Sequence, residues 1–237
     1  YLEDSNIPKF FWKRIRRKLN EIRRWDMTTA KRVDLFLANS TTVADRIKKI
    51  YNRDATVILP PVADRFFENR QPTTDNRNSA YLALGRLVPY KRFDLIIECA
   101  NKHNIPLMIA GKGPDESRLK NLAGPTVEFL GYVPDEKLPE IYANSKALLY
   151  PQEEDAGIAP LEAQSQGTPV IAFKKGGALD TIAEDMSGVF FSEQTVQSLK
   201  GAIDRFEEMN FDSESIKKRA EEFRAERFRE KIESIVK

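Results

Sequence analysis

Short apolar runs alternate with amphipathic stretches from residue 80 onward, and this alternation predicts the fold. Strands are predicted at 80–87, 106–111, 126–133, 147–152, 168–173 and 188–191. After the first of them, Phe93, Ile96, Ile97 and Ala100 fall on one face of a helix. Continuous apolar strands separated by such helices are typical of a parallel sheet covered on both faces. The pattern therefore predicts an α/β fold with a doubly wound, parallel, Rossmann-like sheet.

The remaining elements follow from the same reasoning. Helices are predicted at 91–104, 116–123, 135–146, 195–209, 213–223 and 225–236, and another is predicted near Gly157. Upstream we expect a helix around Trp12 to Trp25, a strand at 33–40, a helix at 41–52 and a strand at 55–61. Ser40 or Thr41 is expected to cap the helix at 41–52. The polar run 69–79 is the predicted domain boundary.

Composition excludes several classes of function. The 237 residues carry 38 basic and 36 acidic side chains, a net charge of +2, so nothing points to nucleic acid. Cys99 and His103 are single residues of their kind, which excludes an internal disulfide and a Cys or His metal cluster, and suits a reducing, cytoplasmic compartment. No segment is apolar for long enough to span a bilayer. Because the first residue is Tyr1, we expect a fragment of a longer protein.

The run at 153–173 is the most informative segment. Gly157 allows a ligand to approach the backbone closely, and Pro160 is tolerated only in the first turn of a helix. Glu154 should then precede the helix, and Glu162 should lie about two turns into it. The free N–H groups of a helix start bind anions, whereas carboxylates bind hydroxyl groups. Phosphates together with hydroxyls describe a nucleotide sugar.

Two cations lie at the same predicted edge of the sheet. Arg86 follows Gly85 at the end of the first strand of the alternating region, and Lys91 begins the next helix. In a parallel sheet, ligands bind beyond the carboxyl ends of the strands. Arg86 can hold a diphosphate in a bidentate manner and Lys91 as a point charge. Each element alone is commonly a loop or a solvated face, so the prediction depends on their meeting at one edge.

These motifs together resemble retaining glycosyltransferases of family 4, which have the GT-B fold. The resemblance is strongest to mannosyltransferases that build bacterial O-antigens and lipid-linked glycans. It covers the chain from about residue 30 onward. The motifs that carry it are ANSTTVADRIKKIY (38–51), VILPPV (57–62), GRLVPYKRFD (85–94), IAGKGP (109–114), FLGYVPDEKL (129–138) and EEDAGIAPLEAQSQGTPVIAF (153–173).

The resemblance implies roles for individual residues. Arg86 and Lys91 would grip the donor diphosphate and stabilise the departing nucleotide, and Glu154 would bind the hydroxyls of the donor sugar. These three form the expected catalytic set, with no metal ion and no cofactor. The expected donor-binding positions are Gly85, Val133, Lys137, Ala156, Gly157, Ile158 and Glu162. Glu162 would bind the ribose, Val133 and Lys137 would meet the base, and the amides of 156–158 would lie along the sugar and phosphates.

This sequence departs from the family pattern at three points. Ala156 stands where an aromatic residue is usual, which loosens the sugar pocket, and Asp180 stands where glutamate is common. Most of the first of two Rossmann-like domains is also absent. We expect residues 1–65 to be the C-terminal remnant of that acceptor-side domain, 66–224 the nucleotide-sugar domain, and 225–237 a helix crossing back. Such a polypeptide is expected to bind nucleotide weakly and to turn over poorly.

A basic segment at 9–25 interleaves Lys and Arg with aromatic and aliphatic residues. As a helix it could contact an anionic membrane, where lipid-linked acceptors reside at the inner face of the plasma membrane. Charge runs are usually solvated faces, however, so packing of its apolar side on another domain is the favoured interpretation.

The resemblance implies transfer of a hexose from a nucleotide diphosphate sugar, with GDP-mannose as the expected donor and a glycan or a lipid-linked acceptor. Two other enzyme readings are a nucleotide-sugar epimerase and a phosphorylase on the same fold, although neither the extra acid/base residues nor a Schiff-base lysine is evident. A third alternative is a nucleotide-binding or scaffolding remnant without activity of its own, whose catalytic half is supplied by another chain.

Overall fold

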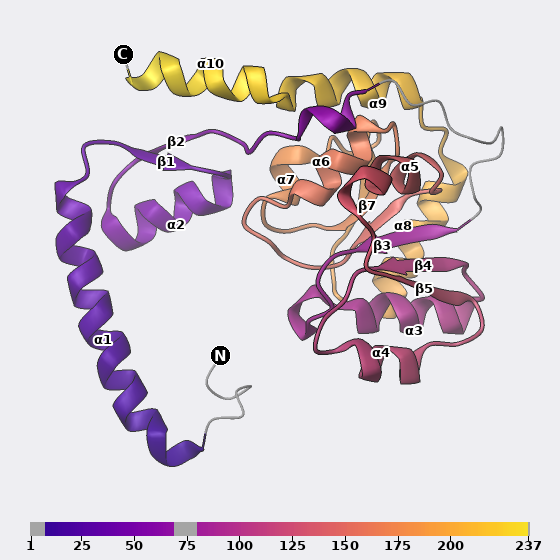
Figure 1. The fold of residues 1–237 in the computed structure, drawn as a ribbon, viewed down its shortest axis with the longest axis horizontal. Helices are drawn as coiled ribbons and strands as arrows, with labels where there is room; N and C mark the ends of the chain where they lie inside the picture. The colour runs from indigo at the N-terminus through magenta and orange to yellow at the C-terminus, as the bar shows by residue number, and fades with distance from the viewer. Residues whose placement is uncertain (1–7, 69–79, 237) are drawn as a thin grey trace.

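The computed structural model describes residues 8–68 and 80–236, which form two separate parallel sheets (Figure 1). The larger sheet has six strands in the order β5-β4-β3-β6-β7-β8. Its strands are β3 (Tyr81–Leu84), β4 (Leu107–Ala110), β5 (Val127–Gly131), β6 (Leu148–Tyr150), β7 (Val170–Phe173) and β8 (Gly188–Phe191). All neighbouring strands are parallel, so the predicted doubly wound sheet is confirmed.

The strand order reverses in the middle of this sheet. From β3 the chain moves outward through β4 and β5, and it then returns to β6 on the other side of β3. Leu82 pairs with Met108 on one side and with Leu148 on the other. The loops after β3 and β6 therefore leave in opposite directions and open a crevice between them, where α/β sheets bind ligands.

Both faces of the six-stranded sheet are covered by helices. These are α3 (Phe93–His103), α4 (Glu116–Leu122), α5 (Leu138–Ala143), α6 (Ile158–Ser165), α7 (Ala178–Thr181), α8 (Val196–Glu208) and α9 (Ser213–Ala220). Successive strand residues enter opposite cores: Tyr81 and Ala83 pack with α3 and α8, whereas Leu82 packs with α5, α6 and α7. Burial on both faces explains why the strands are continuous apolar runs in the sequence.

Within the described residues, the first part of the chain has fewer helices and strands than the large sheet region. It contains α1 (Trp12–Thr29), β1 (Phe36–Ala38), α2 (Thr41–Tyr51) and β2 (Ala55–Val57). The predicted cap is confirmed, because the Ser40 hydroxyl accepts a hydrogen bond from the Val43 N–H at 3.1 Å. β1 and β2 form a parallel pair, and neither α1 nor α2 buries a residue. Large apolar side chains such as Trp25 and Leu37 consequently remain exposed.

Several predicted elements are shorter than expected. The strand predicted at 33–40 forms only three residues of sheet, and the helix predicted at 135–146 splits into the 3₁₀ turn Asp135–Lys137 and α5. Periodicity marks where an element lies, but hydrogen bonding to neighbours decides where it stops. The other 3₁₀ turns are Lys9–Phe11, Ala30–Arg32, Asp64–Phe66, Pro89–Lys91 and Glu221–Phe223. The boundary predicted at 69–79 lies outside the described residues.

The last helix, α10 (Ala225–Val236), leaves the large sheet on the side where β1 and β2 lie (Figure 1). Just before it, the Val62 N–H donates to the Phe223 carbonyl at 2.8 Å, which ties the first part of the chain to the last. The crossing of α10 onto a first domain stays a prediction. Among the described helices, none combines the length and apolar character needed to cross a membrane.

Candidate functional site

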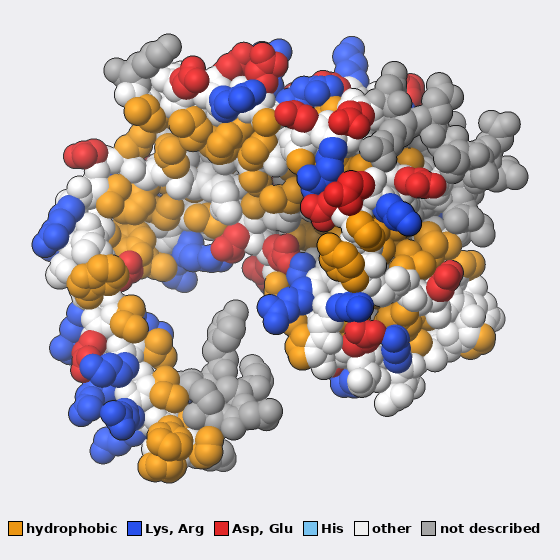
Figure 2. Space-filling model, in the orientation of Figure 1, with side chains coloured by type: hydrophobic (Ala, Val, Ile, Leu, Met, Phe, Trp, Pro, Cys, Tyr) orange, Lys and Arg blue, Asp and Glu red, His pale blue; other side chains and the backbone are white. Residues whose placement is uncertain are grey.

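A cleft of about 1230 Å³ opens at the point where the strand order reverses. Leu84 and Gly85 line it from the end of β3, and Tyr150 lines it from the end of β6. Asn39 and Arg46, from the first part of the chain, form the facing wall. In Figure 2, acidic and basic side chains meet at the inner end of the hollow beside α1 and α2. We call this cavity the donor cleft, after the sugar donor expected at this edge from the sequence.

Three polar side chains form a set within the donor cleft. Lys91 Nζ lies 2.8 Å from Glu154 Oε1, and the Tyr150 hydroxyl donates to Glu154 Oε2 at 2.8 Å. The side chains of Lys91 and Glu154 are only 15% and 23% exposed. A Cβ on Gly85 would lie 3.0 Å from Lys91 Nζ, so the glycine leaves room for the ammonium group. The predicted pairing of a cation with a carboxylate at this edge is therefore present.

The loop from Glu153 to Gly157 is held by backbone geometry. Gly157 has a φ of 71°, and a Cβ there would lie 2.3 Å from the Tyr150 hydroxyl. Only glycine fits both requirements. α6 begins directly afterwards at Ile158, so Pro160 lies in its first turn as predicted. Glu162, however, lies little more than one turn into the helix rather than two, because a turn takes 3.6 residues.

A second cavity of about 300 Å³ adjoins the donor cleft, and we call it the side pocket. It shares Leu84 and Gly85 with the cleft, and Arg86 and Val133 also line it. The predicted base-binding residue Val133 and the predicted phosphate-binding residue Arg86 thus face one space. Lys137 does not line it, because this lysine lies on an exposed 3₁₀ turn between two residues that do.

The structure does not bring Glu162 into the lining of either cavity. Its Oε2 accepts a hydrogen bond from the fully buried Tyr142 at 2.9 Å. Burial raises the pKa of Glu162, although the Tyr142 hydrogen bond and the nearby Arg65 oppose the shift. The four charged residues therefore converge only in part. Lys91 and Glu154 pair in the donor cleft, and Arg86 lines the adjoining side pocket. The contact of Glu162 with the ribose stays a prediction.

Contacts from the first part of the chain to the large sheet were not anticipated. The Arg46 guanidinium binds Asp155 in a bidentate manner at 2.8 and 3.1 Å. Asp180 accepts from both the N–H and the hydroxyl of Thr41, at 2.8 and 2.6 Å. These partners lie more than a hundred residues apart in the sequence. No local pattern could have paired them.

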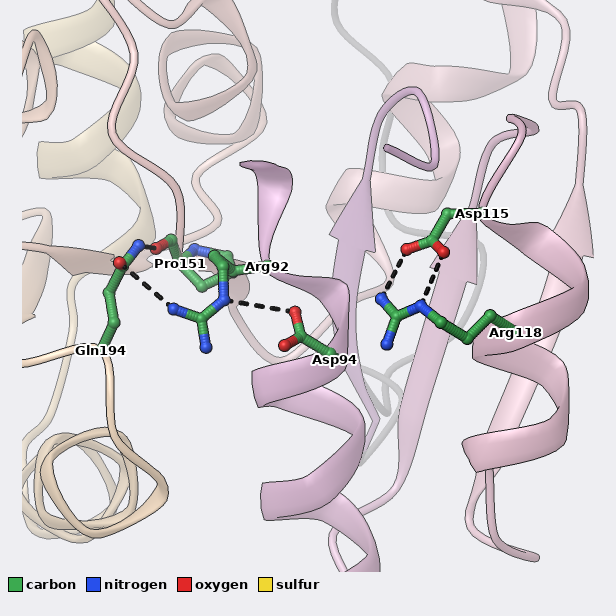
Figure 3. A network of polar contacts seen from close by, with 6 residues as sticks. All are labelled: Arg92, Asp94, Asp115, Arg118, Pro151 and Gln194. Atoms are coloured by element: carbon green, nitrogen blue, oxygen red, sulfur yellow. Dashed lines mark hydrogen bonds and ion pairs between the residues drawn. The ribbon is translucent and has the colours of Figure 1, made fainter. Parts of the chain in front are cut away.

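The far wall of the donor cleft contains a second unpredicted group (Figure 3). Arg92 directly precedes α3 and has a left-handed backbone, and its guanidinium donates to Asp94 and to Gln194, each at 3.3 Å. The Gln194 amide donates in turn to the Pro151 carbonyl at 2.8 Å. This chain of contacts joins the loops after β3, β6 and β8. The position of Arg92, a second cation directly after Lys91, was the one available sequence signal for this group.

Tyr150 was also missed. It is the last residue of the apolar run that forms β6, so the pattern marks it only as core. A hydroxyl at the carboxyl end of a buried strand was a usable signal. Among the residues that the structure describes, no three His, Cys, Asp or Glu side chains are grouped so that they could hold a metal ion.

Comparisons with known proteins identify chains of similar sequence and fold. An uncharacterized glycosyltransferase of Methanocaldococcus jannaschii is 31% identical over 134 residues, covering 52% of this chain and 34% of that protein. A GDP-mannose-dependent alpha-mannosyltransferase of Mycolicibacterium smegmatis is 29% identical over 175 residues, covering 70% of this chain and 46% of that protein. The chain thus spans about a third to a half of the length of these curated relatives.

Among solved structures, HepE of Anabaena in complex with UDP superposes with a TM-score of 0.78 at 18% identity. The match covers 90% of this chain and 66% of that chain, and it confirms the predicted fold class. The sequence model of the family described as "Glycosyl transferases group 1" matches residues 64–223, more than half of the chain. This chain therefore belongs to the glycosyl transferases group 1 family.

Proposed function

We propose that this chain is the donor-binding part of a retaining glycosyltransferase that takes a hexose from a nucleotide diphosphate sugar. The observation that carries the proposal is the partly buried Lys91–Glu154 pair at 2.8 Å, in a cleft at the reversal point of the sheet. A cation and a carboxylate side by side match a ligand in which a diphosphate adjoins a sugar. Arg86 in the side pocket supplies a second cation along the same edge.

The proposed reaction is electrostatic in character. The bond between the sugar C1 and the diphosphate oxygen breaks, and its electron pair leaves with the phosphate. An acceptor hydroxyl forms the new bond to C1 on the same face and gives its proton to the departing phosphate oxygen. Lys91 and Arg86 offset the charge that develops on the leaving phosphate. With two cations at the leaving group, we propose that the reaction needs no metal ion.

The proposed donor is GDP-mannose. The mannosyltransferase of Mycolicibacterium smegmatis supports this choice by its name and its 29% identity over 70% of the chain. HepE was solved with UDP and with UDP-glucose, which makes UDP-glucose the specific alternative. A scaffold without activity predicts no affinity for either nucleotide.

Calorimetric titration of the chain with GDP, GDP-mannose, UDP and UDP-glucose tests the proposal. We expect heat of binding with GDP and a further gain in affinity with GDP-mannose. Preference for the uracil nucleotides would support the transferase assignment but identify a UDP-sugar as the donor. No binding of any of the four would favour the scaffold.

We further propose that the acceptor is a glycan or a lipid-linked glycan and that α1 contacts an anionic membrane beside it. α1 presents basic side chains such as Arg16 and Arg17, while Trp25 is 65% exposed. A helix with a basic face and exposed aromatic residues suits an anionic lipid surface. Co-sedimentation with phosphatidylglycerol vesicles should fall sharply when Arg16, Arg17 and Lys18 are each changed to Glu. Unchanged sedimentation would exclude the membrane contact.

A further inference from the structure

The hydroxyl of Tyr150 is placed to orient the carboxylate of Glu154. Tyr150 closes β6, is only 2% exposed, and lines the donor cleft. Its hydroxyl donates to Glu154 Oε2 at 2.8 Å, while Lys91 Nζ lies 2.8 Å from Oε1. Each carboxylate oxygen thus has its own partner. The plane of the carboxylate is consequently fixed rather than free to rotate.

The hydrogen bond to Glu154 also sets the direction of the tyrosine proton. A tyrosine hydroxyl has one proton to give, and here that proton goes to Glu154. Burial raises the pKa of Tyr150, with Glu154 adding to the shift and Gln152 partly opposing it, so the hydroxyl keeps its proton.

The loop leaves part of the Glu154 carboxylate exposed to the donor cleft. Gly157 passes so near that a Cβ would lie 2.3 Å from the Tyr150 hydroxyl. The neighbouring Ala156 contributes only a methyl group to the cleft lining, at a position where an aromatic residue is usual in the family. Ala156 and Gly157 both line the donor cleft. A sugar entering here would meet the fixed carboxylate of Glu154.

We propose that Tyr150 is a positioning residue that determines donor-sugar specificity by holding Glu154 in one orientation. The proposal rests on the proposed function, because it assigns Glu154 to the sugar of the donor. A carboxylate of fixed direction can distinguish an equatorial from an axial hydroxyl, since hydrogen bonds weaken steeply away from linearity. A carboxylate held by Lys91 alone can turn and accept either.

Two other tyrosine–glutamate pairs in the chain provide matched controls. Tyr142 donates to Glu162 beside α6, and Tyr81 donates to Glu207 at the opposite edge of the sheet. All three tyrosines are buried. A Tyr→Phe change at each removes one hydroxyl and no bulk. Only the pair at Tyr150 lies in the lining of the donor cleft.

The test measures the dissociation constants of GDP, GDP-mannose and GDP-glucose, whose hexoses differ in the orientation of one hydroxyl. If the chain prefers uracil nucleotides, UDP, UDP-glucose and UDP-galactose replace them. For Tyr150→Phe we expect GDP affinity within about two-fold of the unaltered chain, because no phosphate contact is lost. The preferred nucleotide sugar should bind roughly ten-fold more weakly, the value of one hydrogen bond to a charged group. Discrimination between the two sugars should shrink accordingly.

The controls separate this role from a structural one. Tyr81→Phe should change neither constant, and Tyr142→Phe should weaken nucleotide and nucleotide sugar alike if Glu162 binds the ribose. In a chain already carrying Glu154→Gln, Tyr150→Phe should cause no further loss of sugar discrimination, because its effect passes through Glu154. Thermal unfolding of each variant confirms that it is folded.

Two results would overturn the proposal. Intact GDP binding with unchanged sugar discrimination in Tyr150→Phe would refute the role of Tyr150 and leave the proposed function standing. Equal weakening of GDP and GDP-mannose would show a merely structural effect. Absence of any nucleotide binding by the unaltered chain would instead refute the proposed function itself, so the two failures are distinguishable.

Discussion

The two edges of the six-stranded sheet carry the same three residue types in different surroundings. At the carboxyl edge, Tyr150 and Lys91 both contact Glu154. At the amino edge, Tyr81 and Lys146 both contact Glu207, and the Lys146 ammonium lies 5.6 Å from the centre of the Tyr81 ring. The second set joins the start of β3 to α8 and lines neither the donor cleft nor the side pocket.

The surroundings explain why only one set is a candidate site. At the carboxyl edge the loops after β3 and β6 diverge, and glycines leave the backbone open to a ligand. At the amino edge the carboxylate of Glu207 is 42% exposed, so its ion pair contributes little free energy and encloses no space. Residue type alone therefore does not identify a site. Its position in the sheet does.

The largest expected effect comes from removing the lysine at the carboxyl edge. Lys91→Ala should weaken nucleotide diphosphate binding on the order of 100-fold, because a charge-assisted contact is lost and Glu154 stays behind to repel phosphate. Lys146→Ala, the matched change at the amino edge, should alter binding less than about two-fold. Calorimetric titration of both variants makes the comparison. Equal losses would show that the two edges are not distinct in function.

Adding one methyl group to the loop should have an intermediate effect. Gly157→Ala forces a side chain into the left-handed region and against Tyr150, at a cost of about 1–3 kcal/mol in the free energy of unfolding. Gly201→Ala, in α8 with open space around it, should instead stabilise the chain by about 0.5–1 kcal/mol. Urea denaturation measures both. An unchanged free energy of unfolding in Gly157→Ala would show that the backbone at this turn does not require glycine.

The smallest expected effect is a difference in pH dependence. Burial raises the pKa of Glu162, so its contribution to the unfolding free energy falls as pH rises above the ordinary value of 4.5. For Glu207, burial alone would raise the pKa, but hydrogen bonds from Lys146 and Tyr81 lower it overall. Its contribution is present above 4.5 and is lost as pH falls through the lowered pKa.

Glu162→Gln and Glu207→Gln should therefore change the pH profile of stability in different ranges. The first variant should lose less stability than the unaltered chain as pH rises above 4.5, and the second should lose less as pH falls below it. Urea midpoints across the pH range provide the measurement. Parallel profiles for both variants would contradict the assigned environments.

Most of the architecture was predictable because its signals are local. Strands such as β6 and β7 are buried on both faces, so an unbroken apolar run such as that around Ile171 marks them. Gly157 and Pro160 marked the start of α6 for reasons of backbone geometry alone. Arg86, Lys91 and Glu154 could be assigned to one edge because parallel strands place their carboxyl ends together.

The amino-acid sequence by itself thus determined the order of elements, the parallel sheet and the edge that bears the polar residues. Only the tertiary structure decided which side chains meet there. In it, Lys91 and Tyr150 both contact Glu154. Glu162 instead accepts a hydrogen bond from the buried Tyr142, and Arg46 pairs with Asp155 across the cleft. Periodicity depends on neighbours along the chain, whereas these contacts depend on how separate loops approach in space.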